Sequence, residues 1–287
     1  MTELRHDTKI LIVGLGLIGG CYAEALTAKG YSDIGCITKN EEDIDFALSK
    51  GIIKYGVTVP DEKIISDAEL IIFALYPTIF LEWIKKYGKL ISGDTLVTDV
   101  TGVKGSIVEK VQKELVQGAE FISAHPMAGR EKIGVRNSTK DIFKGANYIV
   151  VPTEKNSTSA IEICKKLGEE LGFATVSVLT VDEHDKMIAF LSQLTHCIAI
   201  NLMMSNETPS LERFTGDSFR DLTRIAKIND EMWSELFLMN KDALLHEMDA
   251  FIDKFLCFRK MLADGDRNGM RLEMQRATKR RELFDKK

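Results

Sequence analysis

The sequence predicts an α/β fold: a doubly wound, mostly parallel sheet, followed by an all-helical domain. Up to residue 179, short β-branched runs alternate with helical stretches, whereas from residue 180 onward only helical spacing remains. A glycine-rich turn directly after the first strand is typical of sheets that bind nucleotides. We therefore expect two domains, 1–179 and 180–287.

Five strands are expected within the first 125 residues, each short and apolar on both faces. Such strands are typical of a parallel sheet that helices cover on both sides. They span 9–13, 33–38, 69–75, 95–99 and 120–124, with connecting helices at 17–29, 41–50, 78–90 and 104–116. Two later runs, 147–151 and 175–179, flank a helix around 157–171, and we expect them to extend the same sheet.

The second part of the chain shows helical spacing only. The expected helices are 182–206, 219–227, 232–263 and 270–286. Apolar side chains on the third of these favour a core or a dimer seam over a cofactor site. His184 and His196 fall on the first, and at ~100° per residue their twelve-residue spacing places them about 120° apart.

Composition and charge exclude several classes of protein. Lys and Arg total 38 against 43 Asp and Glu, a net charge of −5 at pH 7, so we expect no nucleic-acid partner. No apolar run reaches the ~18–20 residues of a membrane helix, so we expect no membrane partner. Five scattered cysteines without a CxxC pair predict neither disulfides nor a metal site. We expect a cytoplasmic protein with reduced thiols.

A GxGxxG pattern follows the first strand and opens the first helix. Gly14 permits the tight turn, Gly16 lets the backbone approach a pyrophosphate, and Gly19 allows close packing of the helix on the strand. The N–H groups at the helix N-terminus attract the anion. The pattern therefore predicts a Rossmann-type dinucleotide site. The other residues assigned to this part of the site are Leu17, Ile18 and Leu75.

The identity of the nucleotide stays open. The acidic residue that usually binds an unphosphorylated ribose is missing at the end of the second strand, where Thr38 and Lys39 stand. These two side chains suit a 2′-phosphate and hence NADP, whereas Thr38 or Asn40 holding a plain ribose suits NAD. Both NAD and NADP remain as candidate cofactors.

His125 comes directly after the fifth strand. The carboxyl ends of parallel strands border the crevice where such sheets bind ligands. An imidazole titrates near neutrality, so it can take a proton from a hydroxyl while a hydride leaves the same carbon. His125 is therefore the candidate base of a dehydrogenase.

Four segments, in order, give the chain a resemblance to a known family. They are Val-Gly-Leu-Gly-Leu-Ile-Gly-Gly (13–20), Val-Thr-Asp-Val-Thr-Gly-Val-Lys-Gly (97–105), His-Pro-Met-Ala-Gly (125–129) and Phe-Arg-Asp-Leu-Thr-Arg-Ile-Ala (219–226). The first is common among NAD enzymes, and the others are more specific. Over nearly its whole length the sequence resembles the prephenate/arogenate dehydrogenases of tyrosine biosynthesis, in their monofunctional form.

The resemblance implies an oxidative decarboxylation. Prephenate gives up a hydride from C4 to NAD or NADP, the C4 hydroxyl loses its proton, and carbon dioxide leaves. The ring becomes aromatic in 4-hydroxyphenylpyruvate, so the enzyme mainly supplies orientation, a base and carboxylate recognition. The resemblance also implies a homodimer built through the helical domain.

The same resemblance implies roles for individual side chains. His125 matches the group that draws the proton from the C4 hydroxyl. Arg224 matches an arginine that binds a substrate carboxylate, and His196 matches a histidine associated with substrate binding. Glu131 matches an acid near the pocket entrance. His184 is expected to be a histidine opening the helix, either structural or supporting a residue of the site from behind.

The sequence departs from the family pattern in the 97–105 segment. Gly102 stands where members often have a serine, which would hydrogen-bond both the substrate hydroxyl and the catalytic histidine. Thr101 is adjacent, and we assign it as the replacement, offset by one residue.

Several alternatives stay open. Prephenate is the expected substrate, and arogenate, which carries an ammonium in place of the keto group, is the alternative. His196 favours prephenate, whereas Asp217 suits an ammonium. A different hydroxyacid dehydrogenase on the same plan is a second hypothesis. A third is a nucleotide-binding sensor without catalysis, prompted by Gly102 and the missing ribose-binding acid.

Overall fold

The structure, a computed structural model, describes residues 3–130 and 132–285. The chain divides into two compact units, Met1–Asn240 and Lys241–Lys287. The predicted domain boundary between residues 179 and 180 stays a prediction.

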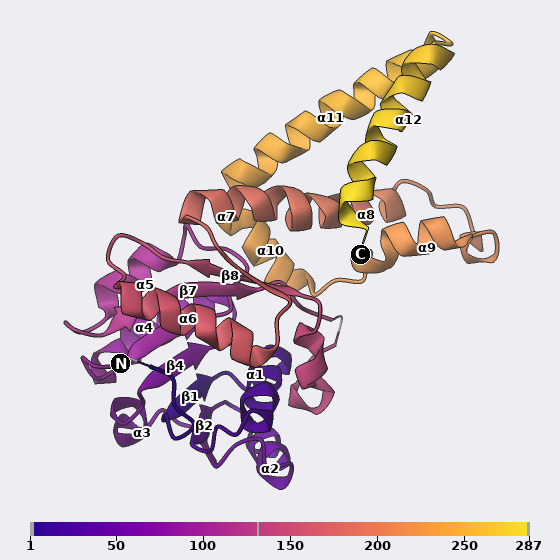
Figure 1. Ribbon diagram of the computed structural model, residues 1–287. Coiled ribbons are helices and arrows are strands. Elements are labelled where there is room, and N and C mark those ends of the chain that lie inside the picture. The colour runs from indigo at the N-terminus through magenta and orange to yellow at the C-terminus, as the bar shows by residue number, and fades with distance from the viewer. Residues whose placement is uncertain (1–2, 131, 286–287) are drawn as a thin grey trace. The chain divides into compact units, whose positions relative to one another are not determined.

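The first unit contains a six-stranded parallel sheet in the order β3-β2-β1-β4-β5-β6 (Figure 1). Its strands are β1 (Ile10–Val13), β2 (Ile34–Ile37), β3 (Tyr55–Val57), β4 (Leu70–Phe73), β5 (Leu96–Asp99) and β6 (Glu120–Phe121). The order reverses direction at β1, and in open α/β sheets ligands bind beyond the carboxyl ends of the strands at such a switch point. Strand β3 is absent from the prediction because three half-buried edge residues are too few to show a period.

Helices cover both faces of this sheet, which confirms the doubly wound fold. They are α1 (Leu17–Ala28), α2 (Glu41–Ser49), α3 (Glu62–Ser66), α4 (Pro77–Tyr87), α5 (Val108–Glu114) and α6 (Thr158–Leu171). Alternate side chains of β1 enter two opposite cores. Ile10 and Ile12 pack with residues of α1, α2 and α6. Leu11 and Val13 pack with residues of α3, α4 and α5.

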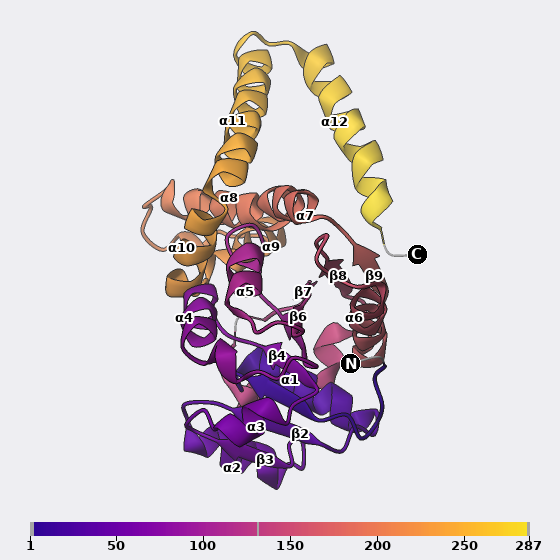
Figure 2. The same ribbon diagram turned by 90° about the vertical axis from the view of Figure 1, so that its left-hand side faces the viewer.

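Three further strands form a second sheet, whose ladder is separate from that of the first (Figure 2). In it β7 (Ser123–Pro126) runs antiparallel to β8 (Asn147–Val151), and β9 (Thr175–Val178) runs parallel to β8. The prediction that the last two runs extend the first sheet is therefore wrong, although both are strands. The side chain of Asp99 accepts a hydrogen bond from the backbone N–H of Ala124. The ladder of β5 therefore ends and the chain crosses to β8.

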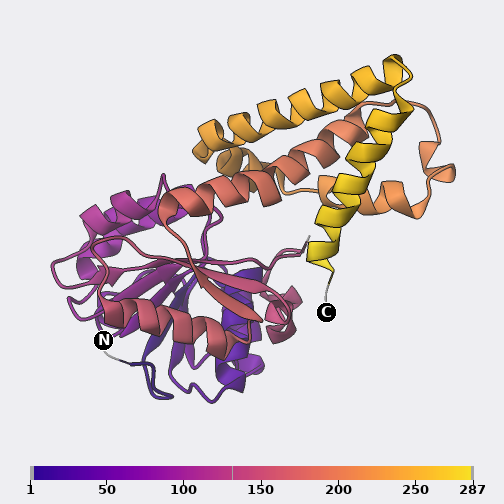
Figure 3. The same cartoon turned by 45° about the horizontal axis from the view of Figure 1, so that its top comes forward.

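One long helical run follows β9. It comprises α7 (Val181–Ile188), a π-helical segment, η4 (Ala189–Leu194), and α8 (Thr195–Met204), which continue one another in Figure 3. Its start is fixed by a capping box between Thr180 and Glu183. The remaining elements of this unit's helical part are α9 (Asp217–Thr223), η6 (Arg224–Ala226) and α10 (Asp230–Met239). Short 3₁₀ turns lie at Gly88–Leu90, Val135–Asn137, Lys140–Phe143 and Leu211–Arg213.

The predicted helix 232–263 is two helices, because the chain leaves helical geometry at Asn240. The buried Asn240 amide donates to the carbonyl oxygen of Asp185, at 2.9 Å, and to Oε1 of Gln193, at 2.8 Å. In turn, Gln193 donates to the carbonyl oxygen of Leu236. These bonds satisfy polar groups that would otherwise be buried without partners.

The second unit consists of α11 (Lys241–Ala263) and α12 (Arg267–Arg281), followed by a 3₁₀ turn, Glu282–Phe284. Asp266 caps α12 by accepting a hydrogen bond from the backbone N–H of Gly269. Several large apolar side chains of α11 are exposed, among them Phe255 and Leu262.

By length and composition alone, the run Val181–Met204 is a candidate membrane span. Its most apolar window has a mean hydropathy of 1.5, and 28% of that window is buried. The expectation that no run is long and apolar enough is therefore wrong. Polar side chains such as Gln193 and His196 interrupt the run. The exposed apolar positions include Phe190, Leu191 and Met204.

Candidate active site

The turn between β1 and α1 requires glycine at two positions. Gly14 has a φ of +98°, in the left-handed region that favours glycine. A Cβ at Gly14 would overlap the carbonyl oxygen of Ala74, and one at Gly19 would overlap that of Gly14. The two glycines therefore let the turn, the sheet and the helix approach one another closely.

The space in front of α1 suits an anion. Gly16 precedes the helix, and no side chain among the described residues caps its first N–H groups. A Cβ at Gly16 would meet no atom of residues 3–130 and 132–285 within 4 Å. Leu17 and Ile18 are half-buried, and the side chain of Leu75 lies beside Gly14. An uncapped helix N-terminus facing open space is a fit site for a pyrophosphate.

The end of β2 carries mixed charge. Thr38 is half-buried and Lys39 is exposed. Asn40 is engaged as the N-cap of α2, since its side chain accepts a hydrogen bond from the N–H of Glu42. The first turn of α2 holds three acids, Glu41, Glu42 and Asp43.

A buried ion pair lies where β5 ends. Lys104 and Asp99 are both fully buried, with Lys104 Nζ 3.0 Å from Asp99 Oδ2. The ammonium also donates to the carbonyl oxygen of Ala124 at 2.6 Å. Asp99 accepts further hydrogen bonds from the hydroxyl of Ser123 and from Thr101. This cluster ties the loop after β5 to β7.

Next to the cluster, two imidazoles and a carboxylate form a chain. Nδ1 of His125 lies 2.9 Å from Nε2 of His184, and Nδ1 of His184 lies 2.7 Å from Oδ1 of Asp185. His125 was expected just after a strand ending at residue 124. It is instead the third residue of β7, in the second sheet. His184 is fully buried and His125 half-buried.

Burial governs the charge of both imidazoles. Desolvation holds the pKa of His125 well below its usual value, and the neighbouring His184 and Lys104 lower it further. Desolvation also lowers the pKa of His184, which the hydrogen bond from its ring to Asp185 partly offsets. His125 is therefore uncharged at neutral pH, the form that accepts a proton.

Thr101 and Gly102 face different surroundings. The buried hydroxyl of Thr101 is engaged with Asp99 and with the carbonyl oxygen of Val103. A Cβ at Gly102, by contrast, would lie 3.9 Å from Cε1 of His125. The geometry therefore points to position 102, rather than Thr101, as the place beside the base.

His196 and Arg224 lie on elements that pack together, α8 and η6. The His196 ring stacks on Trp233, with centroids 3.7 Å apart, and its Nδ1 lies 2.8 Å from the carbonyl oxygen of Ser192. Arg224 is exposed at the start of η6. Glu131 lies outside the described residues. The π segment turns more slowly per residue than an α-helix, which reduces the angle of about 120° expected between His184 and His196.

Two family models together match most of the chain. Residues 22–177 match the model described as "Prephenate dehydrogenase, nucleotide-binding domain". Residues 180–276 match "Prephenate dehydrogenase, dimerization domain". The chain belongs to the prephenate dehydrogenase family. It is thus an oxidoreductase whose Rossmann-like domain uses NAD or NADP, and the family resemblance is confirmed.

Individual members of the prephenate dehydrogenase family match over most of the chain. A prephenate dehydrogenase of Bacillus subtilis is 33% identical over 266 residues, covering 88% of this chain and 69% of the relative. A prephenate dehydrogenase of Aquifex aeolicus, solved with hydroxyphenyl propionate and NAD+, is 29% identical with a TM-score of 0.89, covering 98% of this chain and 99% of that one. An arogenate dehydrogenase of Synechocystis, 22% identical, has a TM-score of 0.84 over 97% of this chain and 100% of its own, and shows a shared fold.

The side chains that support His125 were not predicted from the sequence. Asp99 and Lys104 stand in the quoted 97–105 segment, but nothing in their spacing says that they pair. His184 was expected to be structural or to support a site residue, without its partner being identified, and Asp185 was not singled out. The adjacent His184 and Asp185 at a helix start were the available signal.

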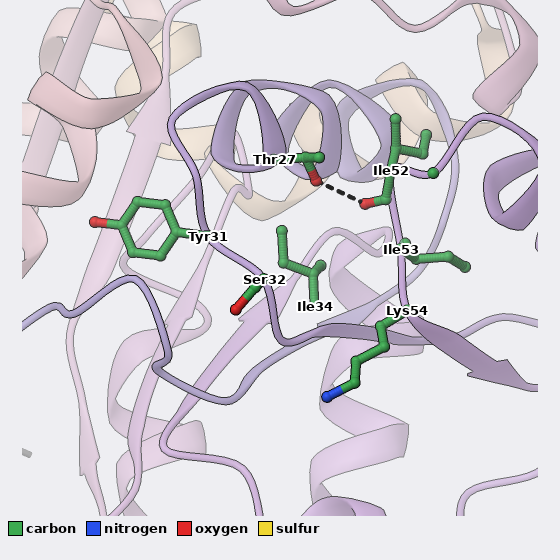
Figure 4. A pocket seen from close by; sticks show the side chains of 8 residues that line it. Thr27, Tyr31, Ser32, Ile34, Ile52, Ile53 and Lys54 are labelled. Carbon is green, nitrogen blue, oxygen red and sulfur yellow. Dashed lines mark hydrogen bonds between the residues drawn. The ribbon is translucent and has the colours of Figure 1, made fainter.

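A pocket of about 200 Å³ lies at the opposite, amino end of β2 (Figure 4). Its lining includes Thr27, Tyr31 and Lys54, and the hydroxyl of Thr27 donates to the carbonyl oxygen of Ile52. Lys54 is paired with Asp33 at 3.0 Å. The pocket therefore lies away from the strand ends that carry the candidate active site.

Proposed function

We propose that this chain oxidises and decarboxylates prephenate to 4-hydroxyphenylpyruvate in tyrosine biosynthesis. The observation that carries the proposal is His125, which is kept uncharged by its surroundings and hydrogen-bonded through Nδ1 to His184. An imidazole held in that form is a base ready to take a proton from a hydroxyl. The membership of the family supplies the substrate class.

The residues of the chain divide the work. The glycine turn with Gly14, Gly16 and Gly19 fits a dinucleotide, whose nicotinamide accepts the hydride when it is bound. His125 draws the proton from the C4 hydroxyl. Arg224 and His196 bind the carboxylate end of the substrate, where a guanidinium pairs with a carboxylate through two hydrogen bonds. Orientation counts most, because the ring becomes aromatic as carbon dioxide leaves.

NAD is the proposed cofactor rather than NADP. Three acids, Glu41, Glu42 and Asp43, form the first turn of α2, just after Lys39 and Asn40. A 2′-phosphate carries negative charge, so these carboxylates oppose it more than Lys39 and Arg136, whose guanidinium lies 4.0 Å from Glu42 Oε2, attract it. We expect a higher kcat/KM with NAD than with NADP. Replacement of Glu41 and Glu42 by Gln should lower the ratio of kcat/KM with NAD to kcat/KM with NADP.

Prephenate is proposed ahead of arogenate. The ammonium of arogenate needs a carboxylate partner, and Asp217 was the candidate. Its Oδ1 lies 2.9 Å from the guanidinium of Arg220, so Asp217 already has a cationic partner. Asp217 is also exposed at the start of α9.

Steady-state assays with prephenate and arogenate, each with NAD and NADP, test the proposal. We expect cofactor reduction with prephenate and carbon dioxide release in equal amounts. Reduction with arogenate alone would transfer the assignment to arogenate dehydrogenase. No reduction with either substrate would leave a nucleotide-binding protein without catalysis.

We also propose a cytoplasmic homodimer. The matched dimerization-domain model spans the helical run with exposed Phe190, Leu191 and Met204. Burying such side chains against a second copy removes apolar surface from water. Analytical ultracentrifugation should give twice the 32.2 kDa chain mass, and a monomer at micromolar concentration would contradict the proposal.

A further inference from the structure

We propose that His184 and Asp185 position His125 by fixing which of its ring nitrogens carries the proton, and that His184 shares the proton which His125 takes up. This inference rests on the proposed function, because it assigns a task to two residues behind the proposed base. His184 and Asp185 act through His125 and are positioning residues.

The chain of contacts fixes each proton. A carboxylate only accepts hydrogen bonds, so the His184 nitrogen facing Asp185, Nδ1, carries a hydrogen. Nε2 of the neutral His184 ring is then an acceptor. His125 must therefore donate from Nδ1 to His184. The remaining nitrogen of His125, Nε2, is left with its lone pair, and this is the atom that can take a proton.

Asp185 is held in place from the opposite side. Its Oδ1 accepts the backbone N–H of Lys104 at 2.9 Å, and its Oδ2 accepts that of Gly105 at 2.7 Å. With His184 it thus has three donors, which leave the carboxylate no freedom to turn. Helix α5 begins at Val108, later than the predicted residue 104. The loop that follows β5 is therefore anchored on the same carboxylate as the histidine pair.

The proton balance follows from this arrangement. The hydroxyl proton passes to Nε2 of His125, and the hydrogen on Nδ1 of His125 moves toward Nε2 of His184. The positive charge then stands beside Asp185. The other charged groups facing the pair are Lys104, which opposes a positive charge on either ring, and Asp99, which favours one on His184. Asp185 offsets the opposition of Lys104.

Two isosteric substitutions separate positioning from mere packing. In His184→Gln, the side-chain amide reaches the place of Nε2 and its oxygen can accept from His125. In His184→Asn, the shorter amide reaches the place of Nδ1, so it can bond Asp185 but leaves His125 without its acceptor. We expect His184→Gln to keep kcat within about tenfold of the parent and His184→Asn to lose about 100-fold, with unchanged KM and NAD affinity.

The pH profile adds a second readout. The acid limb of the kcat profile should move in His184→Gln, because the ring that shares the proton is gone, whereas a packing role would leave the limb in place. Equal kcat values for the Gln and Asn variants would overturn the inference, as would an unmoved acid limb. Far-ultraviolet circular dichroism of both variants shows whether they fold.

A measurement without turnover keeps the inference independent of the proposed function. The chain has five histidines, so ring ¹⁵N spectra of the unmodified protein can be assigned by single substitution. We expect His125 to carry its hydrogen on Nδ1 at pH 7, and His184 likewise. A His125 ring protonated on Nε2 would refute the inference. Wild-type protein inactive on every substrate, with the expected spectrum, would instead refute the proposed function alone.

Discussion

Nζ of Lys104 lies 2.6 Å from the carbonyl oxygen of Ala124, the residue immediately before His125. The same ammonium is paired with Asp99, and neither side chain is exposed. Burial lowers the pKa of Lys104, and the Asp99 carboxylate raises it again in part. One buried cation therefore holds the backbone of β7 and lowers the pKa of the base beside it.

Lys104→Met should strongly destabilise the protein, because it leaves the Asp99 carboxylate buried without its cation. The expected loss in the free energy of unfolding is about 3–5 kcal/mol, measured by urea denaturation. Lys144→Met is the matched control, since Lys144 pairs with Asp141 on the surface. It should cost less than about 1 kcal/mol. Similar losses for the two variants would show that the buried pair is not structural.

His125→Asn should abolish most turnover while leaving nucleotide binding intact. Asn cannot take up a proton, so we expect kcat to fall on the order of 10²–10⁴-fold. Fluorescence titration with NAD checks that the glycine turn still binds its ligand. Turnover within tenfold of the parent would contradict the role of His125 as base.

Stability should fall as the pH drops below the usual histidine range. The pKa values of His125 and His184 are lowered in the folded protein, so the unfolded chain binds protons first, starting near pH ~6.5. The free energy of unfolding therefore decreases from about pH 6.5 down to the folded-state pKa values. Urea denaturation between pH 8 and 5 should show this slope, and His125→Asn should flatten it.

Gly102→Ser should be tolerated and should raise activity. The added Cβ would lie 3.6 Å from Leu236 and 3.9 Å from His125, which is ordinary contact. A hydroxyl beside His125 adds one hydrogen bond to the base or the substrate, for which we expect up to about tenfold in kcat/KM.

Thr101→Val is the matched test of the neighbouring position. Loss of the Thr101 hydroxyl leaves Asp99 with one hydrogen-bond donor fewer. The free energy of unfolding should therefore fall by about 1–3 kcal/mol. If Thr101 acted on the substrate, kcat would fall by 100-fold or more in a variant that remains folded.

Arg224→Ala should act on substrate binding rather than on the chemical step. Removing the guanidinium from a carboxylate partner should raise the KM for prephenate about tenfold or more, with kcat changed by less. Arg220→Ala, four residues earlier on α9 and paired with Asp217, is the control and should leave KM near that of the parent. Equal effects would argue that Arg224 is an ordinary surface cation.

Much of the fold was predictable because its signals are local. β-branched runs bounded by turns placed five of the six strands of the first sheet, and the spacing of Gly14, Gly16 and Gly19 placed the nucleotide turn. The second sheet was not predictable, since its departure from the first depends on Asp99 intercepting the N–H of Ala124. This hydrogen bond joins residues 25 positions apart in the sequence, and it produces no periodic pattern of apolar residues.

The chemistry of the site was predictable, but the hydrogen bonds that connect its side chains were not. His125 was identified by family resemblance and by its proximity to a strand end. Its bond to His184 was not, because 59 residues separate the two rings. The break at Asn240 was missed for the same reason, since it serves buried groups on another helix.

The π segment Ala189–Leu194 makes the helix sensitive to length as well as to composition. A π turn is equivalent to one residue inserted into an α-helix. Deleting a single residue there would restore regular α-helical geometry without turning α8 about its axis, because the wider turn already accommodates one extra residue. Deleting a residue from α7, with the π segment retained, would instead rotate everything downstream by about 100°. His196 would then turn away from Trp233 although every side chain on α8 was retained. The position of this one wide turn thus decides where along the helix the chain tolerates a change of length.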